Sequence, residues 1–320
     1  MSNTVIKVSN DTLSKMKDYY AASITANTPS GAIFSAKVNG ATITAYKSGK
    51  VLFQGNNTAS EAKKWGTSEP SPSKKSSASS FTAKRSVSDH SFRPPATINQ
   101  LSIIGTDEAG TGDYFGPVTV AAAYVSTENI RVLEDMGIRD SKTIKDPQIL
   151  ILGRKITEMI PYSLLVLRNE KYNELQLKGY SQGKMKAMLH EQAISHLLGK
   201  LNGEKPDGIL IDQFCEPGIY FRHTSTNGNR EVPLYFSTKA ESISTAVAAA
   251  SVIARYAFLK HMDRLSEQAG VTIPKGAGSK VDDTAALLIA KKGEAALAPL
   301  AKLHFANTEK ARQIVRKAGL

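Results

Sequence analysis

The sequence holds one cysteine in 320 residues, which excludes a disulfide framework and any zinc or iron–sulfur site built from several cysteines. No apolar run reaches the roughly 18 residues that a membrane-spanning helix needs. The first 25 residues lack the continuous apolar stretch of a signal peptide, and no Ser-His-Asp arrangement or internal repeat is visible. We therefore expect a protein of the reducing cytoplasm, without a membrane anchor.

Positive charge is plentiful and unevenly distributed. The formal net charge is +12, and residues 1–99 alone carry 13 Lys/Arg against 5 Asp/Glu. A basic first third beside a nearly balanced remainder favours a module that binds a polyanion such as nucleic acid. A solvated basic surface that maintains solubility is the alternative, and the charge alone does not decide between them.

The length and one biased segment predict two domains. A single core rarely grows past about 250 residues. Residues 67–97 are rich in serine and proline and show no apolar periodicity, which is typical of a flexible linker. The linker separates a small unit, residues 1–66, from a larger one, residues 98–320.

The small unit has the pattern of an α+β domain. An amphipathic stretch that follows Asn10-Asp11 predicts a helix. Asn39-Gly40 is a strong two-residue hairpin signal between strands at 32–38 and 41–46. A third strand is expected at 51–53, and the capping-box pattern Thr58-Ala-Ser-Glu61 opens a short helix.

In the larger unit, strands come first and helices follow, which predicts an α/β fold with a mixed sheet covered by helices. Apolar runs and helical periodicity give the expected elements: strands at 101–104, 118–125, 163–167 and 209–211, and helices at 181–201, at 241–265 and near the C-terminus.

Carboxylates follow two of these strands directly. Asp107 and Glu108 follow the first strand and precede a glycine-rich loop, and Asp212 ends the strand at 209–211. Carboxylates at strand ends suit hard cations. The alternatives are turn-forming acids or helix caps, and the alternation of a strand would point Asp107 and Glu108 to opposite faces.

A further acid, Glu241, precedes an apolar helical stretch. By itself it is typical of a carboxylate that complements the dipole of a helix N-terminus. Taken with the acids at the two strand ends, however, it supplies the usual ligands of a two-metal nuclease site.

Several segments of the chain resemble bacterial ribonuclease HIII. They are the block Gly105-Thr-Asp-Glu-Ala-Gly-Thr-Gly-Asp-Tyr-Phe-Gly-Pro117, Asp140-Ser141-Lys142, Lys239-Ala240-Glu241-Ser242, Ala246 to Arg255, Pro274-Lys-Gly-Ala-Gly278 and, in the small unit, Tyr46 to Gly55. The resemblance covers nearly the whole chain and keeps the order of the motifs, so chance similarity is improbable.

The resemblance implies a ribonuclease H-like fold in residues 98–320 and a TATA-binding-protein-like domain that binds substrate in residues 1–66. It implies cleavage of the RNA strand of an RNA–DNA hybrid, with Mg²⁺ or Mn²⁺ as cofactor and 5′-phosphate and 3′-hydroxyl products. Two ions about 3.5–4 Å apart are expected. The implied catalytic and metal-binding residues are Asp107, Glu108, Asp212 and Glu241.

Two positions separate the chain from the related ribonuclease HII family. That family has Gly-Arg-Gly where this chain has Gly110-Thr111-Gly112, and usually Asp where this chain has Glu241. Both differences favour ribonuclease HIII. Excision at single embedded ribonucleotides, the HII-type activity, remains an alternative. A non-catalytic nucleic-acid-binding protein is another, although four clustered carboxylates repel phosphate unless metal ions neutralise them.

Candidate substrate contacts are the loop that follows the first acids and four lysines. Glycine removes the side-chain barrier to a close approach by the ribose. Ion pairs with nearby acids are the alternative role for the lysines beside the acids. The expected contacts are Gly110, Thr111, Gly112, Lys142, Lys239, Lys47 and Lys50. We expect a monomer with the RNA–DNA hybrid as its partner.

Overall fold

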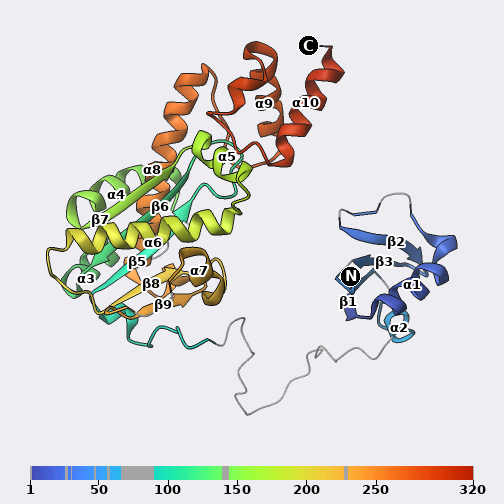
Figure 1. Ribbon diagram of the computed structural model, residues 1–320, viewed down its shortest axis with the longest axis horizontal. Coiled ribbons are helices and arrows are strands. Elements are labelled where there is room, and N and C mark those ends of the chain that lie inside the picture. Colours follow the sequence, from blue (N-terminus) through green and yellow to red (C-terminus); the bar gives the residue numbers. More distant parts are fainter. Residues whose placement is uncertain are drawn as a thin grey trace. The chain divides into compact units, whose positions relative to one another are not determined.

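The computed structural model describes residues 2–25, 28–29, 31–46, 48–55, 58–65, 90–138, 144–226 and 230–319 (Figure 1). The chain divides into two compact units, Met1–Ala83 and Lys84–Leu320. None of the described helices is long and apolar enough to cross a membrane. Most of the predicted linker, its residues 67–89, lies outside the described residues, as does residue 66.

The first unit is an antiparallel four-stranded sheet with helices packed on one face. The strand order is β1-β4-β3-β2. Side chains of α1, among them Leu13 and Met16, share one buried core with Ile43 and Phe53 of the sheet. The elements are β1 (Ser2–Lys7), α1 (Asn10–Tyr19), β2 (Ala32–Val38), β3 (Ala41–Tyr46), β4 (Lys50–Gly55) and α2 (Thr58–Lys63).

The predicted hairpin is confirmed, with both strands at the expected bounds. Asn39 and Gly40 have φ of 50° and 78°, the left-handed backbone that a two-residue hairpin turn of this kind requires. The capping residue of α1 is Ser9, whose side chain accepts the Thr12 N–H, rather than Asn10 or Asp11.

Strand β1 is an element that the sequence pattern does not predict. It pairs with β4 at one side of the sheet. Its two apolar residues, Val5 and Ile6, are neighbours, and only Ile6 is buried, so the strand shows no apolar alternation in the sequence. Glu61 of the predicted capping box is buried, and its Oε1 accepts hydrogen bonds from Tyr20 and Lys64.

The second unit is built on a five-stranded mixed sheet in the order β7-β6-β5-β8-β9. Strands β7, β6 and β5 are antiparallel, and β5, β8 and β9 are parallel. The strands are β5 (Ile103–Ala109), β6 (Val118–Val125), β7 (Tyr162–Leu167), β8 (Gly208–Asp212) and β9 (Leu234–Ser237). The mixed sheet with flanking helices confirms the predicted fold class.

Helices cover both faces of this sheet, and each face has its own core. Ile103 and Leu210 face one core with α4 and α8, whereas Ile104 and Ile209 face the other with α6 and α7. Figure 1 shows α6 lying across the second of these faces. The helices are α3 (Thr127–Asp135), α4 (Asp146–Met159), α5 (Asn169–Leu177), α6 (Gln182–Lys200), α7 (Pro217–Thr224), α8 (Thr245–Ala269), α9 (Ser279–Lys292) and α10 (Ala306–Ala318).

Several predicted bounds need correction. Strand β5 runs on through Asp107 and Glu108 instead of ending before them, because β6 stays paired with it as far as Ala109. The helix expected from residue 241 is α8, which begins at Thr245 behind a Ser244 cap; Glu241 lies in a separate 3₁₀ turn, η4 (Ala240–Ser242). Strand β9 and helices α3, α4, α5 and α7 are further elements that the sequence pattern does not predict.

Residues 90–97, which the sequence pattern assigns to the linker, instead contact the second unit. Phe92 packs against Phe221 and Phe236, and its carbonyl accepts the Phe236 N–H at 2.9 Å. A 3₁₀ turn, η2 (Ile98–Gln100), follows and leads into β5. The described part of the second unit therefore begins before residue 98.

Candidate active site at the carboxyl ends of β5 and β8

The parallel register of two central strands places two acids at one sheet edge. The pairs run from Ile103 with Gly208 to Thr106 with Ile211. The residues that come next on the two strands are Asp107 and Asp212. Parallel neighbours point in the same direction, so the two carboxylates meet at the carboxyl ends of β5 and β8.

Asp107 lies on the α8 face of the sheet, where Ser251 of α8 donates a hydrogen bond to it. Its Oδ1 also accepts the Glu108 N–H at 2.7 Å. Burial, followed by the charges of Asp212 and Glu108, outweighs these bonds and raises the pKa of Asp107 to about 8. Burial and the two neighbouring acids thus both oppose the negative charge of Asp107.

Asp212 connects the end of β8 to the turn η4. Its Oδ1 accepts the Ala240 N–H at 2.9 Å. The residue after Ala240 is Glu241, which is buried at 5% exposure. The hydrogen bond therefore brings the third acidic segment to the sheet edge that Asp107 and Asp212 occupy.

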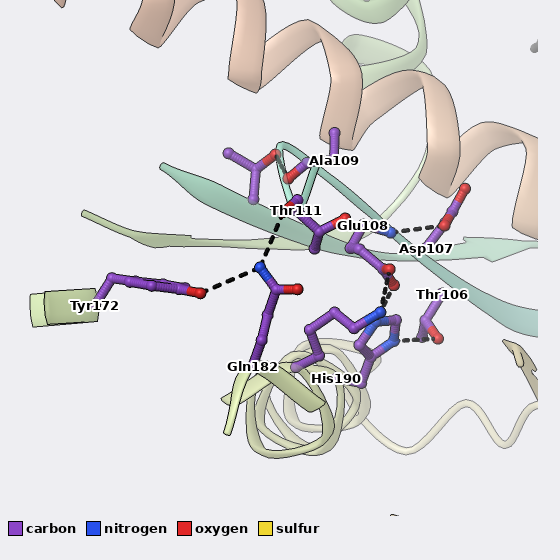
Figure 2. A network of polar contacts seen from close by, with 10 residues as sticks. Thr106, Asp107, Glu108, Ala109, Thr111, Tyr172, Gln182 and His190 are labelled. Atoms are coloured by element: carbon purple, nitrogen blue, oxygen red, sulfur yellow. Dashed lines mark hydrogen bonds and ion pairs between the residues drawn. The ribbon is translucent and has the colours of Figure 1, made fainter. Parts of the chain in front are cut away.

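Glu108 points to the opposite face, as strand alternation predicts. His190 Nε2 lies 3.0 Å from its Oε2 (Figure 2). Lys186 Nζ lies 2.7 Å from its Oε1. Burial opposes the charged form, but the hydrogen bonds and charges of His190 and Lys186 outweigh it and lower the pKa of Glu108 to about 2. Glu108 is thus ionised and held by α6.

The loop after Glu108 is held in shape by bonds from several elements. Gly110 turns the chain with a φ of 88°, a conformation that L side chains rarely adopt. Gln182 of α6 donates to the Thr111 carbonyl at 2.9 Å and to the Tyr172 hydroxyl at 3.1 Å (Figure 2). The fully buried Lys302 donates to two loop carbonyls, those of Asp113 and Gly116, at 2.7 and 2.6 Å.

A cleft of about 360 Å³ opens beside this loop. Its walls include residues 108–113, Ser251 and Arg255 of α8, and Asp146 of α4. Asp146 pairs with Arg255 at 3.1 Å and also with Lys275. Glu108 and the predicted substrate loop therefore share one solvent-accessible depression with Ser251, the residue that binds Asp107.

The predicted lysine contacts lie in different parts of the chain. Lys239 is exposed, with a left-handed φ of 56°, and lies directly before η4. Lys50 is exposed in β4, in the first unit. Lys47 and Lys142 lie outside the described residues.

The polar face of α6 is the part of the site that the sequence reasoning misses. Gln182, Lys186 and His190 are spaced four residues apart, so they lie along one side of the helix. We call these three residues the polar stripe of α6. His190 lacks the spacing of a metal-binding His pair, so the sequence does not predict a metal ligand here. Polar residues at every fourth position nevertheless indicate a polar face on this helix.

The donor set at the sheet edge suits a divalent cation. Carboxylate oxygens are the ligands that Mg²⁺ and Mn²⁺ prefer, and burial, followed by the negative charges of Asp212 and Glu108, raises the pKa of Asp107 at this edge. Among the residues that the structure describes, no three His, Cys, Asp or Glu side chains converge tightly enough to hold a metal. The residue types and their charge fit a divalent cation, while Glu108 is turned toward α6.

A mixed sheet covered by helices on both faces, with partly buried carboxylates at the ends of two central parallel strands, is the arrangement found in nucleases of the ribonuclease H class. A family model described as Ribonuclease HII matches residues 104–308. Residues 3–78 match a model described as Domain of unknown function (DUF3378).

Comparison with related proteins identifies the family within this class. The chain is 57% identical to Ribonuclease HIII of Bacillus subtilis (strain 168) and 56% identical to that of Bacillus velezensis, each over 99% of both chains. The solved structure of Bst-RNase HIII in complex with Mn²⁺ has a TM-score of 0.68 and 41% identity, covering 99% of this chain and 100% of that one. The chain belongs to the ribonuclease HIII family.

A more distant structure agrees in fold. That of Aquifex aeolicus RNase H3 has a TM-score of 0.52 at 22% identity and covers 94% of this chain and 99% of that one. The ribonuclease H-type architecture predicted for the second unit is confirmed by these structures.

Proposed function

We propose that this protein is an endonuclease that hydrolyses the RNA strand of RNA–DNA hybrids and leaves 5′-phosphate and 3′-hydroxyl ends. The observation that carries the proposal is the pair Asp107 and Asp212, which meet at the ends of parallel strands beside an open cleft. Membership of the ribonuclease HIII family supports it.

We propose Mg²⁺ or Mn²⁺ as the cofactor, held by Asp107, Glu108, Asp212 and Glu241. The related Bst-RNase HIII has been solved with Mn²⁺. Bound divalent cations would activate a water molecule and stabilise the charge on the departing 3′-oxygen. The protein's own contribution is to bury Asp107, to tie Asp212 to the backbone of η4, and to hold Glu108 from α6.

The direct test uses a uniform RNA–DNA hybrid and a DNA duplex with one embedded ribonucleotide, each with Mg²⁺, with Mn²⁺ and with a chelator. We expect metal-dependent cutting within the RNA of the uniform hybrid, resolved on a sequencing gel. Folded protein that leaves the uniform hybrid intact with either metal contradicts the proposal. Cutting of the single-ribonucleotide duplex alone supports the HII-type activity instead.

We propose that the backbone at Gly110, Thr111 and Gly112 lies against the ribose of the substrate. A Cβ placed on Gly112 would have no neighbouring heavy atom within 4 Å, and the φ of this residue is not left-handed. An added methyl group at Gly112 therefore costs the free protein little. It would nevertheless stand in the path of a ligand that approaches this backbone.

Gly112→Ala should accordingly raise the KM for the hybrid about tenfold or more, because a displaced contact of about 1.4 kcal/mol corresponds to a factor of ten. The thermal midpoint of the metal-free protein should stay within about 1–2 °C of wild type, because a change well below 1 kcal/mol shifts the midpoint of a protein of this size by no more. Steady-state kinetics and a thermal melt check both. An unchanged KM would contradict the close approach of substrate at this residue.

We propose four lysines as phosphate contacts: Lys239, Lys50, Lys47 and Lys142. The last two lie outside the described residues. Lys239 is exposed and directly precedes the turn that carries Glu241. An exposed ammonium group beside the proposed metal site is available to a phosphate backbone.

We propose that residues 1–66 of the first unit form the expected TATA-binding-protein-like domain and bind the hybrid. Removal of residues 1–89 keeps Phe92 and its contacts. The truncated protein should bind an uncut hybrid more weakly, and the slope of log K against log salt should become shallower, because phosphate contacts are lost. Filter binding at several salt concentrations with a chelator present measures both.

Metal-dependent cleavage should survive this truncation at high enzyme concentration. An unchanged salt slope would show that the first unit does not contact the phosphates.

We further propose that the protein acts as a monomer in the cytoplasm. The single cysteine is compatible with a reducing compartment and supports this location.

A further inference from the structure

The polar stripe of α6 contacts the candidate active site at two positions along the helix. Gln182, in the first turn of the helix, binds the Thr111 carbonyl of the loop. Lys186 and His190, one and two turns further on, both bind Glu108, and Figure 2 shows the contact of His190. A single helix face thus contacts both the proposed substrate loop and one proposed metal ligand.

His190 is the most enclosed member of the stripe. Its side chain has 0% exposure, and its two ring nitrogens contact two residues of β5. Nδ1 lies 2.8 Å from Thr106 Oγ1, and Nε2 lies 3.0 Å from Glu108 Oε2. Thr106 and Glu108 are two residues apart on the strand, so they project from the same face of the sheet.

The chemistry of these partners assigns a hydrogen to one ring nitrogen. A carboxylate oxygen accepts hydrogen bonds and a hydroxyl can donate or accept, so both contacts are satisfied when His190 Nε2 carries the hydrogen and donates it to Glu108. The Thr106 hydroxyl holds the other side of the ring. The imidazole is therefore fixed in orientation from both ends, and the direction of its bond to Glu108 is fixed with it.

Phe214 encloses this arrangement from the β8 side. Its ring lies 5.0 Å from the His190 ring, centroid to centroid, and the Lys186 ammonium lies 4.1 Å from the Phe214 centroid. Phe214 follows Asp212 by two residues. An apolar ring at this position excludes water from the His190–Glu108 bond, which strengthens that bond relative to an exposed one.

We propose that His190, held by Thr106, is a positioning residue that fixes the orientation of the Glu108 carboxylate and thereby sets the affinity for the divalent cation. The inference rests on the proposed function, because it takes Glu108 as a metal ligand. Groups that hydrogen-bond to a metal ligand typically change metal affinity or activity about 10- to 100-fold when they are removed, and a buried ring fixed at both nitrogens is a strong group of this kind.

Two substitutions of similar size separate orientation from packing. In His190→Gln, the new side-chain amide would reach about as far as Nε2, so it can still donate to Glu108. The shorter amide of His190→Asn reaches only the position of Nδ1, so it keeps the contact with Thr106 and loses the contact with Glu108.

A second pair of substitutions tests the Thr106 contact. Thr106→Val removes the hydroxyl with little change of shape, and Thr106→Ser retains it.

The measurement is Mn²⁺ binding to the full-length protein without substrate, by calorimetry, beside a thermal melt in chelator. We expect His190→Asn to weaken Mn²⁺ binding by about 10- to 100-fold. His190→Gln and Thr106→Ser should stay within a few-fold of wild type, and Thr106→Val should fall between. Binding of uncut hybrid in chelator should be unchanged in all four, because none of them removes a proposed phosphate contact.

Two results would overturn the proposal. One is wild-type Mn²⁺ affinity in folded His190→Asn protein, and the other is equal loss in His190→Asn and His190→Gln, which would indicate packing alone. If His190→Asn does not fold, the Thr106→Val and Thr106→Ser pair decides in the same way. A wild-type protein that neither binds Mn²⁺ nor cuts the hybrid contradicts the proposed function itself, which keeps the two failures distinct.

Discussion

Asp212→Asn should abolish metal-dependent cleavage of an RNA–DNA hybrid, with a loss of at least about 1000-fold in kcat. The amide loses the negative charge that a divalent cation needs, and contributions of a few kcal/mol to the transition state correspond to three or more powers of ten. The fold should survive, because the Asn oxygen can still accept the Ala240 N–H that Asp212 accepts at 2.9 Å. Single-turnover cleavage at saturating Mg²⁺ measures the loss.

The chain offers a matched control at the other end of β8. Asp207 lies just before β8 at its opposite end, and its Oδ2 also accepts a backbone N–H, that of Ser102, at 2.9 Å. Asp207→Asn should leave kcat within about twofold of wild type, because a group outside the site contributes well under 1.36 kcal/mol to the barrier. Cleavage by Asp212→Asn at near wild-type rate would remove this carboxylate from the proposed metal site.

Asp212→Asn should also stabilise the metal-free protein, with a dependence on pH that has a definite sign. Burial and the charges of Asp212 and Glu108 raise the pKa of Asp107 to about 8, above the value of about 3.9 in an unfolded chain. The folded state therefore binds this proton more tightly, and stability falls as pH rises from about 4 to 8. The neutral amide introduced by Asp212→Asn removes part of the repulsion, so the melting temperature of the variant in chelator should exceed that of wild type most clearly near pH 8.

Gly105→Ala should destabilise the metal-free protein strongly, by more than about 3 kcal/mol, because overpacking typically costs about 1–3 kcal/mol and more where the opposing atoms cannot move. A Cβ on Gly105 would lie 2.2 Å from the Ala246 carbonyl carbon and from the Val247 nitrogen. Both are backbone atoms in the first turn of α8, so no side-chain rotation can relieve the clash. Urea denaturation measures the change.

The same substitution in an open helix is the control. Gly199 lies in α6, and a methyl group added there would meet no heavy atom within 4 Å. Gly199→Ala should raise stability by about 0.5–1 kcal/mol, since alanine loses less conformational entropy in a helix than glycine. Wild-type stability of Gly105→Ala would show that α8 lies further from β5 than the structure places it.

Local patterns predict the elements that local physics determines. The Asn39-Gly40 hairpin has both strands at the expected bounds because the turn fixes the pairing. Periodicity predicts helix α6 to within one residue at each end. Strand β1 escapes prediction, since Val5 is exposed and the strand is recognisable only by its pairing with β4.

The site is predictable in part, for a similar reason. Asp107 and Asp212 stand out because each follows an apolar strand run, but their meeting depends on the parallel register of β5 and β8, which no local signal encodes. His190 and Lys302 escape prediction because their partners, Glu108 and the Gly116 carbonyl, lie 82 and 186 residues away in the chain. Of these two residues, only His190 is indicated by the sequence, through the polar residues at every fourth position along α6.

The opposite orientations of Asp107 and Glu108 have an evolutionary consequence. The two residues are neighbours in the chain, yet Asp107 is bound by Ser251 of α8, and Glu108 by His190 and Lys186 of α6. Substitutions tolerated around one acid should therefore correlate with changes in α8, and those around the other with changes in α6. If both acids hold the metal as proposed, substitutions in α6 alone or in α8 alone would change metal affinity while the other helix layer stays the same.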